Sequence, residues 1–256
     1  EKCIQSIPSA SLKYHASNNH LSNWLSTRGE FYLASQFRKL KKNDFKNIEK
    51  RRRHHLKLLS QTTTHSENPI IVEFSNSTKN FNHNFIQIGE GSLGGKARGL
   101  AYANTLFTKD KFNGKFKNVD IRIPKIISIA TNEFDKYMEL NNLWEIALSK
   151  KTNNQILKSF IKSKLPKTLI AKLSNVINNI KYPLAIRSSS LLEDSQYQPL
   201  AGMYSTFMLP NSHPNDKERL NQLCETIKRI YASTFFQEPK SLMDSIIHRH
   251  EEEKMA

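Results

Sequence analysis

Apolar residues in the first 60 positions recur three and four residues apart, which is the spacing of an amphipathic helix. The positions that carry this spacing are Trp24, Leu25, Phe31, Leu33, Phe37 and Leu40. We therefore expect residues 1–60 to be helical, with a second, highly charged helix from Asp44 to about Ser60. Polar residues follow up to Pro69 and are typical of a linker.

Further along, short apolar runs that fit strands alternate with longer runs that fit helices. The predicted strands are 85–88, 123–129, 183–187 and 203–209, and the sequence PLAIR over 183–187 is typical of a buried strand. The predicted helices are 100–107, 131–148 (capped by Thr131), 153–163, 166–180 and 214–236. This alternation predicts an α/β or α+β domain over residues 70–256, preceded by a helical, basic segment and linker over residues 1–69.

Composition excludes several classes of protein. The 256 residues include two cysteines, Cys3 and Cys224, which are far apart and outside any C-x-x-C pattern. A disulfide framework and a zinc finger are therefore excluded, and a reducing, cytoplasmic location is expected. No apolar run is long enough to cross a membrane. Because the sequence opens on Glu1, we expect a piece of a longer protein.

The chain is strongly basic, with 39 Lys and Arg against 23 Asp and Glu. A basic balance favours polyanionic partners, and residues 41–57 hold eight of the positive charges. A compositional drift toward Lys, Asn and Ile explains much of the excess equally well. A solvated helix face or a linker remains the simpler interpretation of residues 41–57, and we do not expect a nucleic-acid partner.

A glycine-rich segment from Gly89 to Leu100 lies between a predicted strand and a predicted helix. Glycines let the backbone approach an anion closely, and the start of a helix offers unpaired N–H groups to it. Lys96 adds a full positive charge, so the segment predicts a phosphate site that includes Gly94 and Gly95. It is not a P-loop, because Ala97 follows the lysine. A tight turn with a solvated Lys96 is the alternative.

A second candidate site begins at Arg187, which ends the predicted strand 183–187 and precedes three serines that can donate hydroxyl groups, Ser188 among them. A buried arginine needs an anionic partner. Glu193 or Asp194 could supply it as an internal ion pair, and a phosphate could supply it from outside. Downstream, Gly202 permits close backbone approach and Thr206 offers another hydroxyl.

The two blocks, GGK-x-x-G-L and RSS followed by ED, AG and T, resemble the N-terminal nucleotide-binding domain of pyruvate phosphate dikinase, phosphoenolpyruvate synthase and rifampin phosphotransferase. The resemblance covers about residues 86–256 and implies the N-terminal portion of an ATP-grasp fold. It implies that Lys96 and Arg187 contact the phosphates of ATP, and that Gly202 and Thr206 line the same pocket.

The resemblance also implies a reaction. Members pass a phosphoryl group from ATP to a histidine on a separate domain, and from there to pyruvate or another acceptor, releasing AMP. It places the Mg²⁺ ligands and that histidine beyond residue 256, with Glu193 and Asp194 shaping a loop. We therefore expect no catalytic residue and no turnover in this chain alone. A nucleotide-sensing regulatory or interaction module with the same fold remains the alternative.

Overall fold

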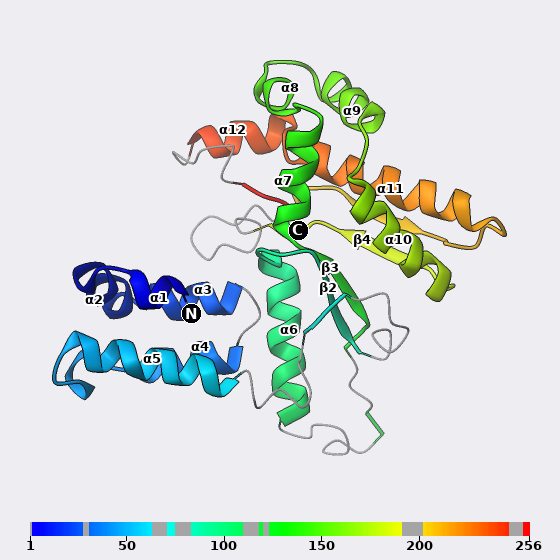
Figure 1. The fold of residues 1–256 in the computed structure, drawn as a ribbon. Helices are drawn as coiled ribbons and strands as arrows, with labels where there is room; N and C mark the ends of the chain where they lie inside the picture. Colours follow the sequence, from blue (N-terminus) through cyan, green and yellow to red (C-terminus); the bar gives the residue numbers. More distant parts are fainter. Residues whose placement is uncertain are drawn as a thin grey trace.

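Helices surround two small sheets in this protein (Figure 1). The structure is a computed structural model that describes residues 2–27, 31–62, 71–74, 83–109, 118–119, 123–190, 202–245 and 253–256. The strands are β1 (Val72–Glu73), β2 (Phe85–Ile88), β3 (Ile126–Ile129), β4 (Leu184–Arg187) and β5 (Thr206–Leu209). The helices are α1 (Lys2–Ser6), α2 (Ser9–Ser17), α3 (His20–Thr27), α4 (Phe31–Lys39), the 3₁₀ turn η1 (Lys42–Asp44), α5 (Ile48–Thr62), α6 (Gly94–Lys109), α7 (Thr131–Leu140), α8 (Trp144–Leu148), α9 (Asn153–Lys162), α10 (Lys167–Asn179), α11 (Asp216–Ser233) and α12 (Gln237–Ser245).

The first sheet is parallel and has the order β1-β2-β3. Its central strand carries the apolar run Phe85, Ile86 and Ile88, and all three side chains are buried. Parallel neighbours need a crossover connection, and α6 lies within the one between β2 and β3. The mixture of helices, a parallel sheet and an antiparallel sheet is consistent with the predicted α/β class.

The second sheet is an antiparallel pair in which Arg187 of β4 lies opposite Thr206 of β5. Its strands alternate between partly buried and exposed residues. Leu184 and Ile186 pack on the core, whereas Ala185 and Arg187 are exposed. The prediction of a buried strand over residues 183–187 was therefore wrong. A two-stranded sheet covered on one face leaves every second side chain in solvent.

The main core joins both sheets to α7–α12. Its centre is an aromatic cluster made by Phe134, Tyr137, Trp144, Phe160, Tyr231 and Phe235. The Tyr137 hydroxyl donates to the carbonyl of Phe160 at 2.6 Å, which ties α7 to α9. The predicted helices at 153–163, 166–180 and 214–236 are confirmed. The predicted helix 131–148 is interrupted at Asn142, whose φ of 49° is left-handed.

Residues 2–27 and 31–62 form helices α1–α5 with a small core of their own, built from Leu25, Leu33, Ala34 and Phe37. The predicted helicity of this segment is confirmed, although the pattern over residues 24–40 belongs to two helices and Trp24 is 55% exposed. Helix α3 lies against α6 (Figure 1). Among the described helices, none is both long and apolar enough to cross a membrane.

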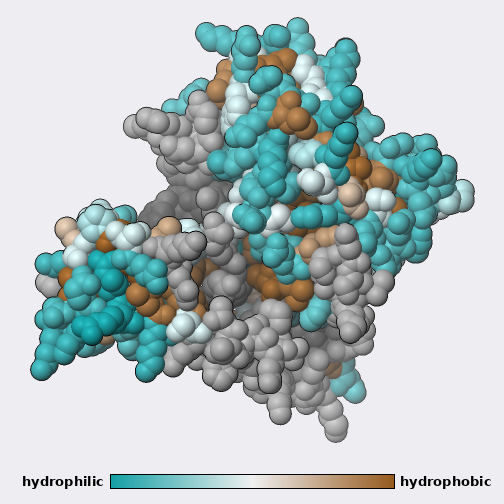
Figure 2. All heavy atoms as spheres, viewed as in Figure 1, coloured by the Kyte–Doolittle hydropathy of each residue, from teal (hydrophilic) through white to brown (hydrophobic). Residues whose placement is uncertain are grey.

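Part of the basic run turns inward. Arg51 on α5 is 4% exposed and donates to the carbonyls of Ala16 and Leu40. Its neighbour Arg52 donates to the carbonyl of Ile4. Residues 1–62 carry 13 Lys and Arg against four Asp and Glu, and Figure 2 shows a largely hydrophilic surface over these helices. A solvated face or a linker therefore does not account for the whole run, because two of its arginines join helices internally.

His55 is the other buried polar residue of α5, at 1% exposure. Its ring stacks on Phe37, with 4.5 Å between the ring centroids. Its Nδ1 atom has no hydrogen-bond partner among the described residues. Burial, followed by the positive charges of Arg51 and His54, lowers the pKa of His55 to about 4. The folded helices therefore hold this imidazole neutral.

We predict that the helical segment loses stability as the pH falls from 7.5 to 5. The pKa of His55 is depressed in the folded state, so below about 6.5 the unfolded chain binds a proton that the folded chain excludes. The loss from this residue is about 2 kcal/mol at pH 5. Urea unfolding followed by Trp24 fluorescence measures it in a Trp144→Phe background.

The control for this prediction is His55→Leu, which removes the titrating ring and keeps an apolar side chain next to Phe37. Between pH 7.5 and pH 5, the free energy of unfolding of this variant should fall by about 2 kcal/mol less than that of the parent protein. Equal pH dependence in both proteins would show that His55 titrates normally in the folded state.

Candidate functional site

The glycine-rich loop after β2 is held against the start of α7. The N–H of Glu90 donates to Asn132 Oδ1 at 2.9 Å, and the N–H of Ser92 donates to Thr131 Oγ1 at 3.0 Å. Gly91 has a φ of +107°, and a Cβ there would lie 2.7 Å from the same Thr131 oxygen. The side chain of Thr131 therefore helps to hold the glycine-rich loop in place. The prediction that it caps α7 was wrong, because Ala130 occupies that position.

Helix α6 begins at Gly94, earlier than predicted, so Lys96 stands in its first turn. Three of its first N–H groups already have acceptors. Gly94 donates to Ser92 Oγ at 3.2 Å, Gly95 to the carbonyl of Ser190 at 2.8 Å, and Ala97 to Ser189 Oγ at 3.0 Å. The expectation that this helix start offers unpaired N–H groups to an anion was wrong for these three, because Ser92 and two serines from the loop after β4 accept their hydrogen bonds.

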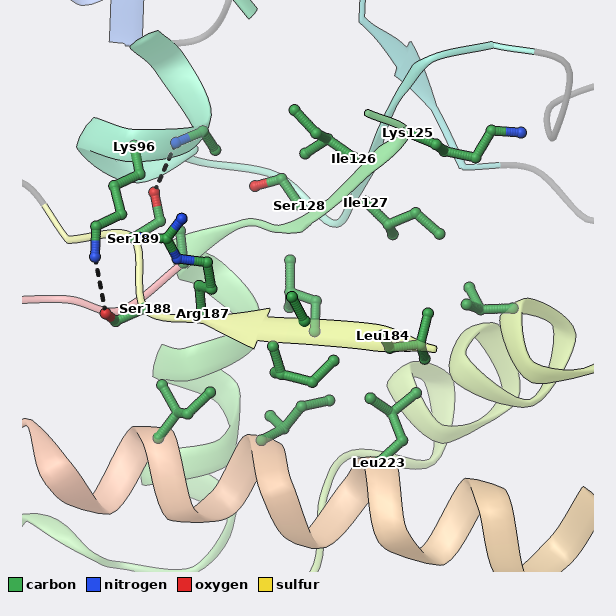
Figure 3. Close-up of a pocket in the computed structure, with 18 of the residues that line it drawn as sticks. Lys96, Lys125, Ile126, Ile127, Ser128, Leu184, Arg187, Ser188, Ser189 and Leu223 are labelled. Atoms are coloured by element: carbon green, nitrogen blue, oxygen red, sulfur yellow. Dashed lines mark hydrogen bonds between the residues drawn. The ribbon is translucent and has the colours of Figure 1, made fainter. Parts of the chain in front are cut away.

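Lys96 and Arg187 approach the same place from different elements. The Lys96 ammonium donates a long hydrogen bond of 3.4 Å to the hydroxyl of Ser188, a buried residue that directly follows β4. Figure 3 shows Lys96, Arg187, Ser188 and Ser189 together at one end of a pocket. Two positive side chains and a hydroxyl thus lie together, although Lys96 and Arg187 are 91 positions apart in the sequence. Such a group favours an anionic ligand.

The pocket extends from this polar end between β3 and β4 and has a volume of about 580 Å³. Volumes of 300–1,000 Å³ are roughly what small-molecule sites provide. Most of its wall is apolar and comes from β3, β4, α10 and α11. These wall residues include Ile127, Ile129, Leu173, Val176, Leu184, Ile186, Leu223, Ile227 and Ile230. Leu184, Leu223 and Lys125 lie toward the end opposite Lys96 (Figure 3).

A comparison with protein families matches residues 90–256 to the pyruvate phosphate dikinase AMP/ATP-binding domain. The chain belongs to this family. The resemblance predicted from the two sequence blocks is thereby confirmed, and both blocks lie inside the matched residues. No curated protein and no solved structure matches the chain.

Two other predicted residues of this AMP/ATP-binding domain, Gly202 and Thr206, are not among the described residues that line the pocket. Thr206 opens β5 directly opposite Arg187, on the exposed face of the antiparallel sheet. Gly202 has a φ of +79°, and no heavy atom lies within 4 Å of the Cβ position. Glu193 and Asp194 lie outside the described residues. The nucleotide-binding roles of Gly202 and Thr206 stay predictions.

Sequence reasoning missed two hydroxyl groups that belong to pocket-lining residues. Ser128 on β3 and Tyr231 on α11 border the pocket, and both side-chain oxygens are buried without a hydrogen-bond partner among the described residues. Burial, followed by the charge of Glu133, raises the pKa of Tyr231, so its phenol stays protonated. For Ser128, the sequence offered one signal, a polar residue inside the apolar run IISI over residues 126–129. For Tyr231, it offered none.

The described residues of this AMP/ATP-binding domain contain no group of three or more His, Cys, Asp or Glu that could hold a metal ion. The pocket end formed by Lys96, Arg187 and Ser188 is cationic and hydroxylic, and no described Asp or Glu side chain lines the pocket to offer the carboxylate that Mg²⁺ prefers. These residues fit the phosphates of a nucleotide and do not fit a cation.

We predict that Gly94→Ala unfolds or strongly destabilises the domain. Gly94 has a φ of +72°, and a Cβ there would lie 1.7 Å from the carbonyl oxygen of Ser189. The backbone must shift to relieve this overlap, at a cost of more than about 2 kcal/mol. Thermal unfolding measures the loss.

Gly99→Ala is the matched control on the same helix, because no heavy atom lies within 4 Å of its Cβ position. Alanine in a helix interior is more stable than glycine by about 0.5–1 kcal/mol, so this variant should melt at a higher temperature than the parent. Equal melting temperatures for the two variants would contradict the close packing of α6 on Ser189.

Proposed function

We propose that the pocket binds ATP, with the phosphates at the Lys96 and Arg187 end and the base between the apolar walls. One observation carries this proposal: Lys96 and Arg187 lie together at one end of an apolar pocket in a chain of the AMP/ATP-binding family. Phosphates match the cationic end, since arginine can donate two parallel N–H bonds to an oxyanion. A planar base matches the aliphatic walls of β3 and β4.

The two cations also fit the chemistry of phosphoryl transfer. That reaction needs the transferring group held in place and its negative charge compensated, with little covalent help from the protein. Lys96 and Arg187 would supply the positive potential, and Ser188 would hold the Lys96 ammonium before the nucleotide binds. When bound, Mg²⁺ would neutralise further phosphate charge, and we propose that its ligands lie outside the described residues.

For the whole activity, we propose the ATP-binding portion of a phosphotransferase like phosphoenolpyruvate synthase or pyruvate phosphate dikinase. In this proposal residues 70–256 form the first part of an ATP-grasp domain and residues 1–69 form a separate basic segment. The phosphoryl group passes to a histidine on another domain and then to pyruvate or another acceptor. Family membership supports the nucleotide chemistry.

A nucleotide-sensing module without catalysis is the second candidate, and one contact favours it. Helix α3 of the N-terminal segment lies against α6, whose first turn carries Lys96. A nucleotide that binds Lys96 would therefore contact α6, the helix against which the N-terminal segment packs. Under this alternative, ATP slows amide hydrogen exchange in α3 as well as in α6, whereas a purely catalytic role requires protection in α6 alone.

We predict that Lys96→Ala and Arg187→Ala each weaken ATP binding by about 10- to 100-fold, because each removes a charged contact to phosphate worth roughly 1.5–3 kcal/mol. Adenosine, which has no phosphate, should bind both variants as it binds the parent. Isothermal titration with ATP and with adenosine measures the difference.

The controls for this titration remove a charge of the same type away from the pocket. Lys158→Ala changes an exposed lysine on α9, and Arg229→Ala changes an arginine that pairs with Glu225 on α11. Both should bind ATP like the parent. Unchanged ATP affinity in the Lys96 and Arg187 variants would refute the assignment of those two residues.

A further inference from the structure

We infer that Ser189 is a positioning residue, which fixes the start of α6 next to β4 and thereby sets the place of Lys96 relative to Arg187. This inference rests on the proposed function, because it concerns the phosphate end of the same pocket. Ser189 would touch no substrate. It would act through two cations, Arg187 two residues before it in the chain and Lys96 next to its hydrogen-bond partner Ala97.

The hydroxyl of Ser189 bridges two backbone groups of the α6 start. Its oxygen accepts from the N–H of Ala97 at 3.0 Å, and its proton goes to the carbonyl of Leu93 at 2.8 Å. A serine hydroxyl has one proton to donate, so its whole donor capacity and one of its two lone pairs are committed to the start of α6. The residue is 6% exposed, which leaves water little access to replace either bond.

The backbone of Ser189 is fixed as firmly as its hydroxyl. Its N–H donates to the carbonyl of Ala256 at 3.1 Å, and the N–H of Ala256 donates back to the carbonyl of Ser189 at 3.1 Å. The next residue, Ser190, accepts from the N–H of Gly95 at 2.8 Å. Gly94 has no side chain, so its backbone can approach the carbonyl of Ser189 closely. The loop after β4 is therefore held from both sides.

These bonds surround the two cations. Lys96 lies between Gly95 and Ala97, whose N–H groups are bound by the carbonyl of Ser190 and the hydroxyl of Ser189. Arg187 and Ser188 directly precede Ser189 in the loop (Figure 3). Without the hydroxyl, the start of α6 loses two of its bonds to this loop, those of Leu93 and Ala97, and the backbone on either side of Lys96 is held less firmly next to Arg187.

The expected signature is a loss of affinity restricted to the phosphates. Ser189→Ala should weaken ATP binding by about tenfold, while adenosine affinity stays within about twofold of the parent. A residue that served stability alone would behave differently. Partial unfolding lowers the apparent affinity for ATP and for adenosine by the same factor, which is the fraction of folded protein.

Isothermal titration of the chain with ATP and with adenosine tests the inference, with thermal melting to confirm that each variant is folded. Ser22→Ala is the matched control, because Ser22 is a buried serine in α3 that donates to the carbonyl of Asn19. It should leave both affinities unchanged. Should Ser189→Ala fail to fold, Ser189→Cys keeps the size and a weaker donor, and a smaller loss for ATP alone is expected.

The outcomes separate the two proposals. If the parent binds ATP and the Ser189 variants bind both ligands as the parent does, or lose both equally, Ser189 positions nothing and the proposed function stands. If the parent binds ATP no better than adenosine, the pocket has no phosphate end and the proposed function falls. A selective loss for ATP in the Ser189 variants supports both.

Discussion

The site depends on how the first N–H groups of α6 are satisfied. Buried backbone donors must find acceptors, and the sequence before α6 provides one side chain for this, Ser92. The remaining acceptors come from Ser189 and Ser190, which lie more than 90 residues away in sequence. This requirement draws the end of β4 onto the start of α6. The cationic end of the pocket forms as a result.

The spacing of apolar residues correctly predicted the strands and helices that bury one continuous side of the element. Strand β2 and helices α9–α11 follow directly from apolar residues at strand or helix period, and Leu223, Ile227 and Ile230 share the predicted face of α11. The sequence also singled out Lys96 and Arg187, which stand in recognisable motifs and line one pocket, and their nucleotide-binding roles stay predictions. These features need no knowledge of distant partners.

Features that depend on distant partners were missed or predicted wrongly. The hydroxyl of Thr131 could cap its own helix, and instead it accepts a hydrogen bond from the N–H of Ser92. The sequence PLAIR is apolar enough for a buried strand, yet the exposed face of its sheet leaves Arg187 in solvent. Arg51 appeared to be one more surface charge and lies inside the helical segment. In each case a contact between elements decided the outcome.

The pocket lies between two sheets that share no strand in the described part of the chain. Its width is therefore set by aliphatic side chains and by the Ser189 loop, and not by a hydrogen-bonded ladder that runs across it. Moving β3 away from β4 changes only contacts between apolar side chains and breaks no hydrogen bond within either sheet. A thicker ligand would therefore disturb side-chain packing along the walls, whereas at the cationic end it would meet α6 hydrogen-bonded to the loop after β4.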